Sequence, residues 1–286
     1  MPNTVKVPKD FEKIFDKAEE DVGAYFREIK RDPSKGTIEI GGERYILVRA
    51  ASMSVDFFDT VKKFYNDKSE EEAFFVAHEM LFDISHAIGK QDAKDFHKKL
   101  GLTDPIEKLS AGPVHFAHSG WAFVDIFPES RPTPDKNYYL IYDHPYSFEA
   151  DAWEKRLRHS KSSVCVMNAG YSSGWCEESF GVPLVASEIM CRAKGDETCR
   201  FIMAHPDHID GRIKEYLNAD ANLAKRISGY DIPGFFEIKK VETELRSRID
   251  ELETFQKLLV GREVRMIELK DRIRELEERL KERGGS

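Results

Sequence analysis

Hydrophobic and polar residues alternate with two different periods along the first half of the chain. Helical spacing of apolar residues predicts helices over residues 11–29, 54–65, 70–88 and 92–100. Between the first two, GTIEIGGERYILVRA alternates apolar and polar residues, which predicts two strands around Gly41 and Gly42. Local helices and a hairpin therefore occur in one stretch of about 100 residues.

Strand-like patterns are more frequent from residue 115 onward. The segments HFAHSGWAFVDIF and NYYLIYDHPY are rich in β-branched and aromatic residues and are predicted as strands. Residues 165–181 combine strand, turn and helix character, and two further strands are predicted between Pro183 and Phe201. We therefore predict an α+β fold, a mixed α/β domain with an antiparallel sheet.

A different pattern begins after Pro233 and Gly234, where aromatic residues almost vanish. From Phe255 the apolar positions follow a 4-3 spacing, interrupted once by Arg262: Leu259, Met266, Leu269, Ile273, Leu276 and Leu280. A heptad pattern of this kind predicts a long C-terminal coiled-coil helix over residues 235–283. A solitary charged surface helix is the alternative, but it would leave this apolar stripe in water.

Composition restricts the class of protein. The 286 residues are 41% hydrophobic and carry a formal net charge of −8, so a core can form while the basic surface typical of nucleic-acid binding is not expected. No apolar run approaches the roughly 20 residues that span a bilayer, and the first residues lack a secretory pattern. We predict a cytoplasmic protein without direct contact to nucleic acid or membrane.

All four cysteines fall between residues 165 and 199. In a reducing cytosol such a cluster is more typical of metal ligands or free thiols than of disulfides. In SEIMCRAKGDETCRF a turn at Gly195 can return Cys199 toward Cys191, and Glu188 lies three residues before Cys191. Cys165, predicted on a preceding strand, would complete a closed set of four ligands. The spacing by itself also fits buried, inert thiols.

These motifs resemble a known family. CVMNAGYSSGWCEESFG and SEIMCRAKGDETCRF resemble the 4-vinyl reductase-type domain of phenol- and xylene-sensing bacterial regulators. GTIEIGGERYILV, ISHAIGKQDA, GPVHFAHSG and SFEAD resemble segments of the sensory domain of the same regulators, so the resemblance covers about 190 residues. It implies structural zinc bound by Cys165, Glu188, Cys191 and Cys199, whereas Cys176 has no counterpart among the family's ligands.

The resemblance also implies a buried pocket for a small aromatic effector. By alignment, Phe116 stands where phenol sensors have a histidine, and His144 stands where they have a tryptophan. Ile126, Tyr142 and Trp175 are further expected wall residues, although each can also be ordinary core. His115 or His118, as a strand neighbour, could approach His144. Because both polar anchors of the phenol sensors are replaced here, phenol cannot simply be carried over as the ligand, and the expected ligand class is an aromatic or other hydrocarbon-like molecule.

The resemblance implies a domain order: an N-terminal helical segment (1–22), the sensory domain (23–210), with its 4-vinyl reductase-type zinc subdomain at about 150–210, a linker (211–234) and the coiled coil (235–283). The expected function is that of a sensor module which is not an enzyme, pairs as a homodimer through the sensory domain and the coil, and acts on an output kinase or regulator outside this chain. The coil resembles the linker helix of two-component histidine kinases.

Two other functions stay open at this point. A reductase is suggested by the name of the domain, but no GxGxxG dinucleotide motif follows a strand and a four-ligand zinc site offers no open position. A non-catalytic assembly module is suggested by the similar fold of vesicle-tethering subunits. A sensor should bind a specific small molecule reversibly and without turnover, whereas a scaffold should be indifferent to it.

Overall fold

The computed structural model describes residues 3–219. The chain divides into two units, Met1–Ile232 and Pro233–Ser286, and the described residues all belong to the first. The predicted coiled coil lies outside the described residues. No helix within residues 3–219 is long and apolar enough to cross a membrane.

The first three long helices follow the predicted periodicity, with one correction. They are α1 (Glu12–Arg27), α2 (Val55–Phe64) and α3 (Glu70–Leu100); the short 3-10 turn η1 (Lys9–Phe11) precedes α1 and a second, η2 (Ala50–Met53), precedes α2. The prediction of two helices over residues 70–100 was wrong, because α3 is continuous. Its start is fixed by a capping box between Ser69 and Glu72, and it ends only at Gly101, which has a φ of 65°.

The strand predicted for HFAHSGWAFVDIF is wrong at its start, because the first four residues belong to helix α4 (Pro105–His118). Asp104 caps this helix by accepting from the backbone N–H groups of Ile106 and Glu107, and Pro105 occupies the first turn. Only Val124–Ile126 is a strand, β5. The helix start signal lies eleven residues upstream of the aromatic segment that suggested a strand.

A five-stranded sheet forms the centre of the unit, with the order β1-β5-β6-β8-β7. Its strands are β1 (Val5–Lys6), β5, β6 (Tyr139–His144), β7 (Val185–Met190) and β8 (Cys199–Ala204). All neighbours are antiparallel except β1 and β5, so the prediction of an α+β fold with an antiparallel sheet is confirmed. The strands β7 and β8 lie where two strands were predicted.

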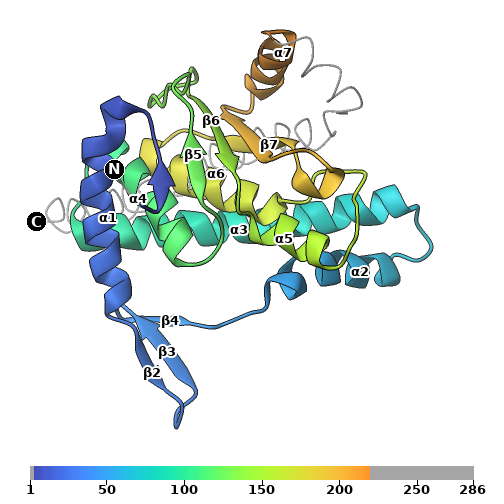
Figure 1. The fold of residues 1–286 in the computed structure, drawn as a ribbon, viewed down its shortest axis with the longest axis horizontal. Helices are drawn as coiled ribbons and strands as arrows, with labels where there is room; N and C mark the ends of the chain where they lie inside the picture. Colours follow the sequence, from blue (N-terminus) through green and yellow to red (C-terminus); the bar gives the residue numbers. More distant parts are fainter. Residues whose placement is uncertain (1–2, 220–286) are drawn as a thin grey trace, which may run out of the picture. The chain divides into compact units, whose positions relative to one another are not determined.

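Helix α6 (Val166–Phe180) packs against α3 through glycine contacts (Figure 1). A Cβ on Gly170 would lie 2.2 Å from the Ser85 hydroxyl, and one on Gly174 would lie 2.1 Å from the backbone oxygen of His86. Such contact distances exclude larger side chains at both positions. The backbones of the two helices are therefore in close contact along the side of α6 that faces α3.

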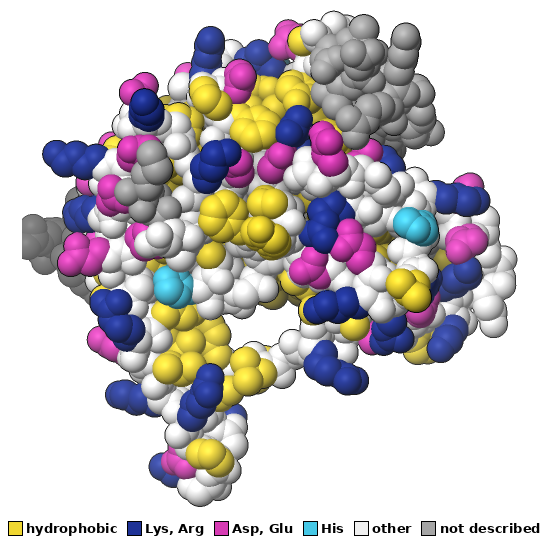
Figure 2. Space-filling view, in the orientation of Figure 1, with side chains coloured by type: hydrophobic (Ala, Val, Ile, Leu, Met, Phe, Trp, Pro, Cys, Tyr) yellow, Lys and Arg dark blue, Asp and Glu magenta, His cyan; other side chains and the backbone are white. Residues whose placement is uncertain are grey.

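The remaining elements lie around this core. Helix α5 (Phe148–Lys155) follows β6, η3 (Arg192–Lys194) joins β7 to β8, and α7 (Ile209–Ala219) follows β8. The predicted hairpin around Gly41 and Gly42 is confirmed as β3 (Thr37–Ile40) and β4 (Glu43–Tyr45), with β2 (Lys30–Asp32) as a third strand that projects with them beyond the end of α1 (Figure 1). Acidic and basic side chains are interspersed over the face in Figure 2.

Candidate metal centre and ligand cavity

Three cysteines and one glutamate converge at the end of the five-stranded sheet. One ligand atom from each of Cys165, Glu188, Cys191 and Cys199 lies within 4.8 Å of the others, and all four residues are buried. The sulfurs of Cys165 and Cys199 are 3.5 Å apart, and the cysteines are not disulfide-bonded. Ligands about 2.3 Å from a tetrahedral zinc ion lie about 3.8 Å apart, so the cluster has the dimensions of such a site.

Four different elements supply these side chains. Glu188 lies in β7, Cys191 follows that strand, and Cys199 begins β8 after the turn at Gly195, which has a φ of 99°. Cys165 is the residue that precedes α6, so its predicted position on a strand is wrong. The cluster thus joins the end of the sheet to the N-terminus of α6.

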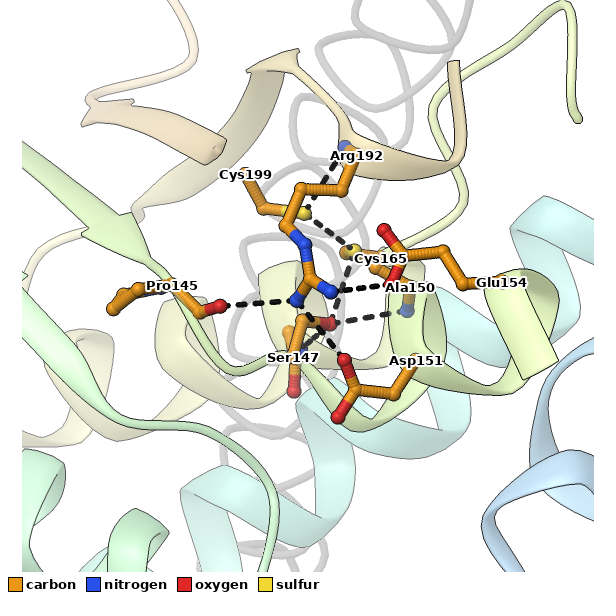
Figure 3. A network of polar contacts seen from close by, with 9 residues as sticks. Pro145, Ser147, Ala150, Asp151, Glu154, Cys165, Arg192 and Cys199 are labelled. Atoms are coloured by element: carbon orange, nitrogen blue, oxygen red, sulfur yellow. Dashed lines mark hydrogen bonds and ion pairs between the residues drawn. The ribbon is translucent and has the colours of Figure 1, made fainter. Parts of the chain in front are cut away.

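A polar network surrounds the sulfurs (Figure 3). The backbone N–H of Arg192 donates to the Cys199 sulfur at 3.4 Å, and its guanidinium group donates to Pro145 O and to Asp151, each at 2.9 Å. The same guanidinium also pairs with Glu154. These contacts fix η3 against α5 and place a cationic side chain near the cluster.

Without a cation, burial favours the neutral forms of two of the four groups. Burial raises the pKa of the Cys165 thiol and of the Glu188 carboxyl well above their ordinary values. Glu188 Oε2 accepts the backbone N–H of Cys165 at 2.9 Å, while Oε1 is buried without a hydrogen-bond partner among the described residues. A metal ion would satisfy this oxygen and stabilise the ionised thiolates.

A cavity lies on one face of the sheet, between the sheet and the helices α4 and α6. The atom-free space among its walls, including the part where it opens, is about 380 Å³. All five expected pocket residues line it: Phe116, Ile126, Tyr142, His144 and Trp175. Cys176, which was expected to be a pocket or packing thiol, also lines it, and the other wall residues were not predicted: Leu109, Gly112, Pro113, Val124, Leu140, Tyr171, Ser172 and Met203.

His144 is a polar residue of the cavity wall whose two ring nitrogens both lack hydrogen-bond partners among the described residues. The residue is 0% exposed. Burial lowers its pKa to about 3, so the ring is neutral and offers one donor and one acceptor. The ring of Phe116 lies 5.5 Å from it between centroids, so an apolar wall stands directly beside this polar group.

Two histidines that were expected near His144 have other partners. His115 and His118 lie on helix α4 rather than on a strand. His115 Nδ1 lies 3.0 Å from the Tyr171 hydroxyl, which donates to Asp92 at 2.9 Å, and His118 stacks on Phe26. The hydroxyl of Tyr171 is thus bound to protein groups while its ring lines the cavity.

The cavity and the cysteine cluster occupy neighbouring positions of one strand pair. His144 and Cys199 are direct partners in the antiparallel ladder between β6 and β8, so their side chains lie on the same face of the sheet. Phe201 lies two residues along β8, and its ring is 4.5 Å from that of His144. The first residues of β8 therefore include Cys199, which belongs to the cluster, and Phe201, which contacts His144 of the cavity.

The chain is similar in sequence and in fold to phenol-sensing regulators. Over 132 residues, 46% of its length, the chain is 28% identical to the phenol regulator MopR of Acinetobacter guillouiae, and it spans 22% of that protein. The phenol-responsive sensory domain of the transcription activator PoxR, solved with phenol, matches with a TM-score of 0.57 and 19% identity, covering 69% of this chain and 94% of that one. The resemblance to phenol-sensing regulators is confirmed.

Weaker likenesses extend to a vinyl-4-reductase family protein from Methanocaldococcus jannaschii. That structure is 18% identical, with a TM-score of 0.34 over 69% of this chain and 98% of that one. No family model matches the sequence. The likeness to the PoxR domain establishes a shared fold, and the stretch similar to MopR is a small part of that regulator.

Proposed function

We propose that the chain is a non-catalytic sensor module of a bacterial signal-transduction protein. It binds a small, neutral, aromatic or hydrocarbon-like effector in the cavity beside a structural zinc ion. The observation that carries the proposal is the unpartnered, neutral His144 ring in an otherwise largely apolar cavity. A polar substituent on an apolar ring would satisfy that histidine while the other walls enclose the ring.

The effector is expected to be uncharged. No Lys, Arg, Asp or Glu is among the described residues that line the cavity, and His144 stays neutral at physiological pH. A carboxylate would therefore enter without a cationic partner, which is strongly unfavourable in a buried site. Phenols, hydroxylated methylbenzenes and indoles fit these conditions, whereas benzoate does not.

Zinc suits the cluster because three of its four groups are thiols, which favour zinc over calcium or magnesium. Cys165, Glu188, Cys191 and Cys199 would hold the ion with no position left for substrate. When bound, the ion would hold the end of β8 against the start of α6 and thereby support the wall that contains His144. A structural rather than a catalytic role follows from that closed ligand set.

The metal site is tested by replacing one ligand. Cys191→Ser should lower the zinc content of purified protein from one ion per chain to well below that ratio, and should lower thermal stability. Cys176→Ser is the matched control, because Cys176 is also buried but lies outside the cluster. An equal zinc content in both variants would refute the assignment.

Signal transmission is proposed to run through the coiled coil of residues 235–283 in a homodimer, to an output kinase or regulator domain. The support for this is the heptad pattern of the sequence and the relation to regulators. Deleting residues 255–280 should weaken self-association in sedimentation experiments. An unchanged oligomer would mean that the coil does not contribute to dimerisation.

A thermal-shift screen of the zinc-loaded protein separates the sensor from an assembly module or a reductase. A ligand at 100 times its Kd should raise the free energy of unfolding by about 2.7 kcal/mol. Phenols, methylbenzenes and indoles should produce such shifts while benzoate does not, and the bound compound should be recovered unchanged. A flat response would refute the sensor proposal, and conversion of the ligand would favour an enzyme.

A further inference from the structure

Two fully buried polar residues adjoin the cysteine cluster without belonging to it. Ser147 precedes α5 and Asn168 lies in the first turn of α6, and both are 0% exposed. The Ser147 hydroxyl is 3.1 Å from the Cys165 sulfur; Figure 3 marks this contact by a dashed line. Asn168 Nδ2 donates to the same hydroxyl at 2.8 Å, and the backbone N–H of Ala150 donates to it at 3.4 Å.

This geometry determines the direction of the hydrogen bond to sulfur. A serine hydroxyl has one hydrogen and two lone pairs, and both lone pairs here receive a donor, from Asn168 and from Ala150. The one remaining hydrogen is directed at the Cys165 sulfur. A metal-bound thiolate carries no hydrogen of its own, so a metal-loaded cluster imposes the same direction on the contact.

We propose that Ser147, oriented by Asn168, is a positioning residue of the metal site, whose hydroxyl donates to the Cys165 thiolate and retains it in the ligand set. The inference rests on the metal site proposed above. Three thiolates and one carboxylate exceed the charge of a divalent cation by two negative charges. Donors to sulfur disperse that excess, and the Arg192 N–H plays the corresponding part at Cys199.

The contact also explains why these polar groups are buried together. Asn168 N–H donates to Glu149 Oε2 at 2.9 Å, which ties the start of α6 to α5. The Asn168 side chain then spans from that helix to Ser147. A buried polar pair is costly unless its hydrogen bonds are satisfied, and the sulfur provides the acceptor that the Ser147 hydrogen requires.

The test measures metal release rather than ligand binding. Zinc-loaded wild-type protein and Ser147→Ala are mixed with an excess of a colorimetric chelator. The variant is expected to release zinc about 10–100-fold faster, the usual effect of losing an outer hydrogen bond to a metal ligand. Cobalt-loaded Ser147→Ala should also show its sulfur-to-metal charge-transfer band at lower energy, because the thiolate becomes a stronger donor.

Loss of the helix cap is controlled separately. Ser147 also caps α5, so Ser147→Ala removes a cap as well as the bond to sulfur. Ser69→Ala removes the cap of α3, far in sequence from the cluster, and should leave the release rate within twofold of wild type. Asn168→Asp keeps its size but offers only acceptors, so it should divert the Ser147 hydrogen from sulfur and also accelerate release.

The possible results separate this inference from the metal site itself. If wild-type protein binds zinc one to one and both Ser147→Ala and Asn168→Asp release it at the wild-type rate, the positioning role is overturned and the metal site stands. If wild-type protein binds no zinc, both proposals fail.

If the variants do not fold, the wild-type protein loaded with cadmium-113 is examined by nuclear magnetic resonance. Scalar coupling between the metal and the Ser147 hydroxyl hydrogen supports the inference. A hydroxyl hydrogen directed at Asn168, without that coupling, overturns it.

Discussion

Replacing His144 by phenylalanine should raise the free energy of unfolding of the ligand-free protein and weaken its affinity for a hydroxylated aromatic ligand. The ring of His144 is fully buried and leaves two polar nitrogens without partners among the described residues. Each unsatisfied buried polar group costs about 1–3 kcal/mol, so the pair costs on the order of 2–6 kcal/mol. His144→Phe removes both and keeps a planar ring among Phe116, Tyr142 and Phe201.

The expected gain is about 2 kcal/mol, at the lower end of that range, because phenylalanine is larger and must be accommodated by the cavity. For a unit of this size the gain corresponds to a rise in Tm of about 4–8 °C. Phenol should lose about 1.4 kcal/mol of binding free energy, or tenfold in Kd, since one hydrogen bond is lost. Toluene, which makes no such bond, should lose less than about threefold by the same reasoning.

The assay is urea denaturation of the zinc-loaded protein together with calorimetric titration of phenol and toluene. Tyr138→Phe is the control, because its hydroxyl is also fully buried with no nitrogen or oxygen partner among residues 3–219 and only the weakly bonding Cys176 thiol beside it, yet Tyr138 is not a wall residue of the cavity. The control should gain stability and keep its affinity for phenol. A loss of stability in His144→Phe, or an unchanged Kd for phenol, would refute the reasoning.

Three further predictions concern packing and pH. Gly174→Ala should destabilise the protein by about 3 kcal/mol or more in urea denaturation, because its Cβ would lie 2.1 Å from His86 O, whereas Gly211→Ala on the open side of α7 should stabilise by up to about 1 kcal/mol. Burial raises the pKa of Asp92 to about 6, above its ordinary value of 3.8, so ionised Asp92 disfavours the folded state and stability falls as pH rises between these values. Asp92→Asn should remove that fall and raise the free energy of unfolding at neutral pH by up to about 3 kcal/mol, with no gain at pH 3. The Kd for phenol should stay constant from pH 5 to pH 8, because the pKa of His144 is lowered to about 3; a fivefold change in titration calorimetry would contradict this.

Local patterns in the sequence were sufficient for α1 and α2 and for the β7 edge of the five-stranded sheet. Helices α1 and α2 follow from periodicity because each buries one face that its own residues define, whereas β7 and β8 were predicted although they are buried along almost their whole length. Residues 105–118 show where this fails. The aromatic segment 115–127 suggested a strand that would begin at residue 115, whereas the cap at Asp104 starts a helix that runs to His118 and whose Gly112 fits against Trp175 of α6.

Some residues of the candidate site could also be predicted from the sequence, and others could not. The identities of the cluster residues and of five wall residues could be proposed from the sequence because the motifs resemble those of a known family, and the spacing carried that information without a structure. Wall residues such as Leu140 and Met203 carry no chemical signal, and only the alternation of their strands could have indicated them.

Hydrogen-bond satisfaction was decided by the tertiary structure alone. The sequence contains nine histidines, and the family resemblance placed His144 in the pocket and His115 beside it, without showing which of the two already has a hydrogen-bond partner in the protein. Folding brings His115 within 3.0 Å of the Tyr171 hydroxyl and leaves both nitrogens of His144 without a partner among the described residues. Whether a polar atom has a hydrogen-bond partner depends on groups that are far apart in the chain. Composition and periodicity therefore indicate which residues are buried, whereas the packing of α4, α6 and the sheet decides which buried polar groups can still bind a ligand.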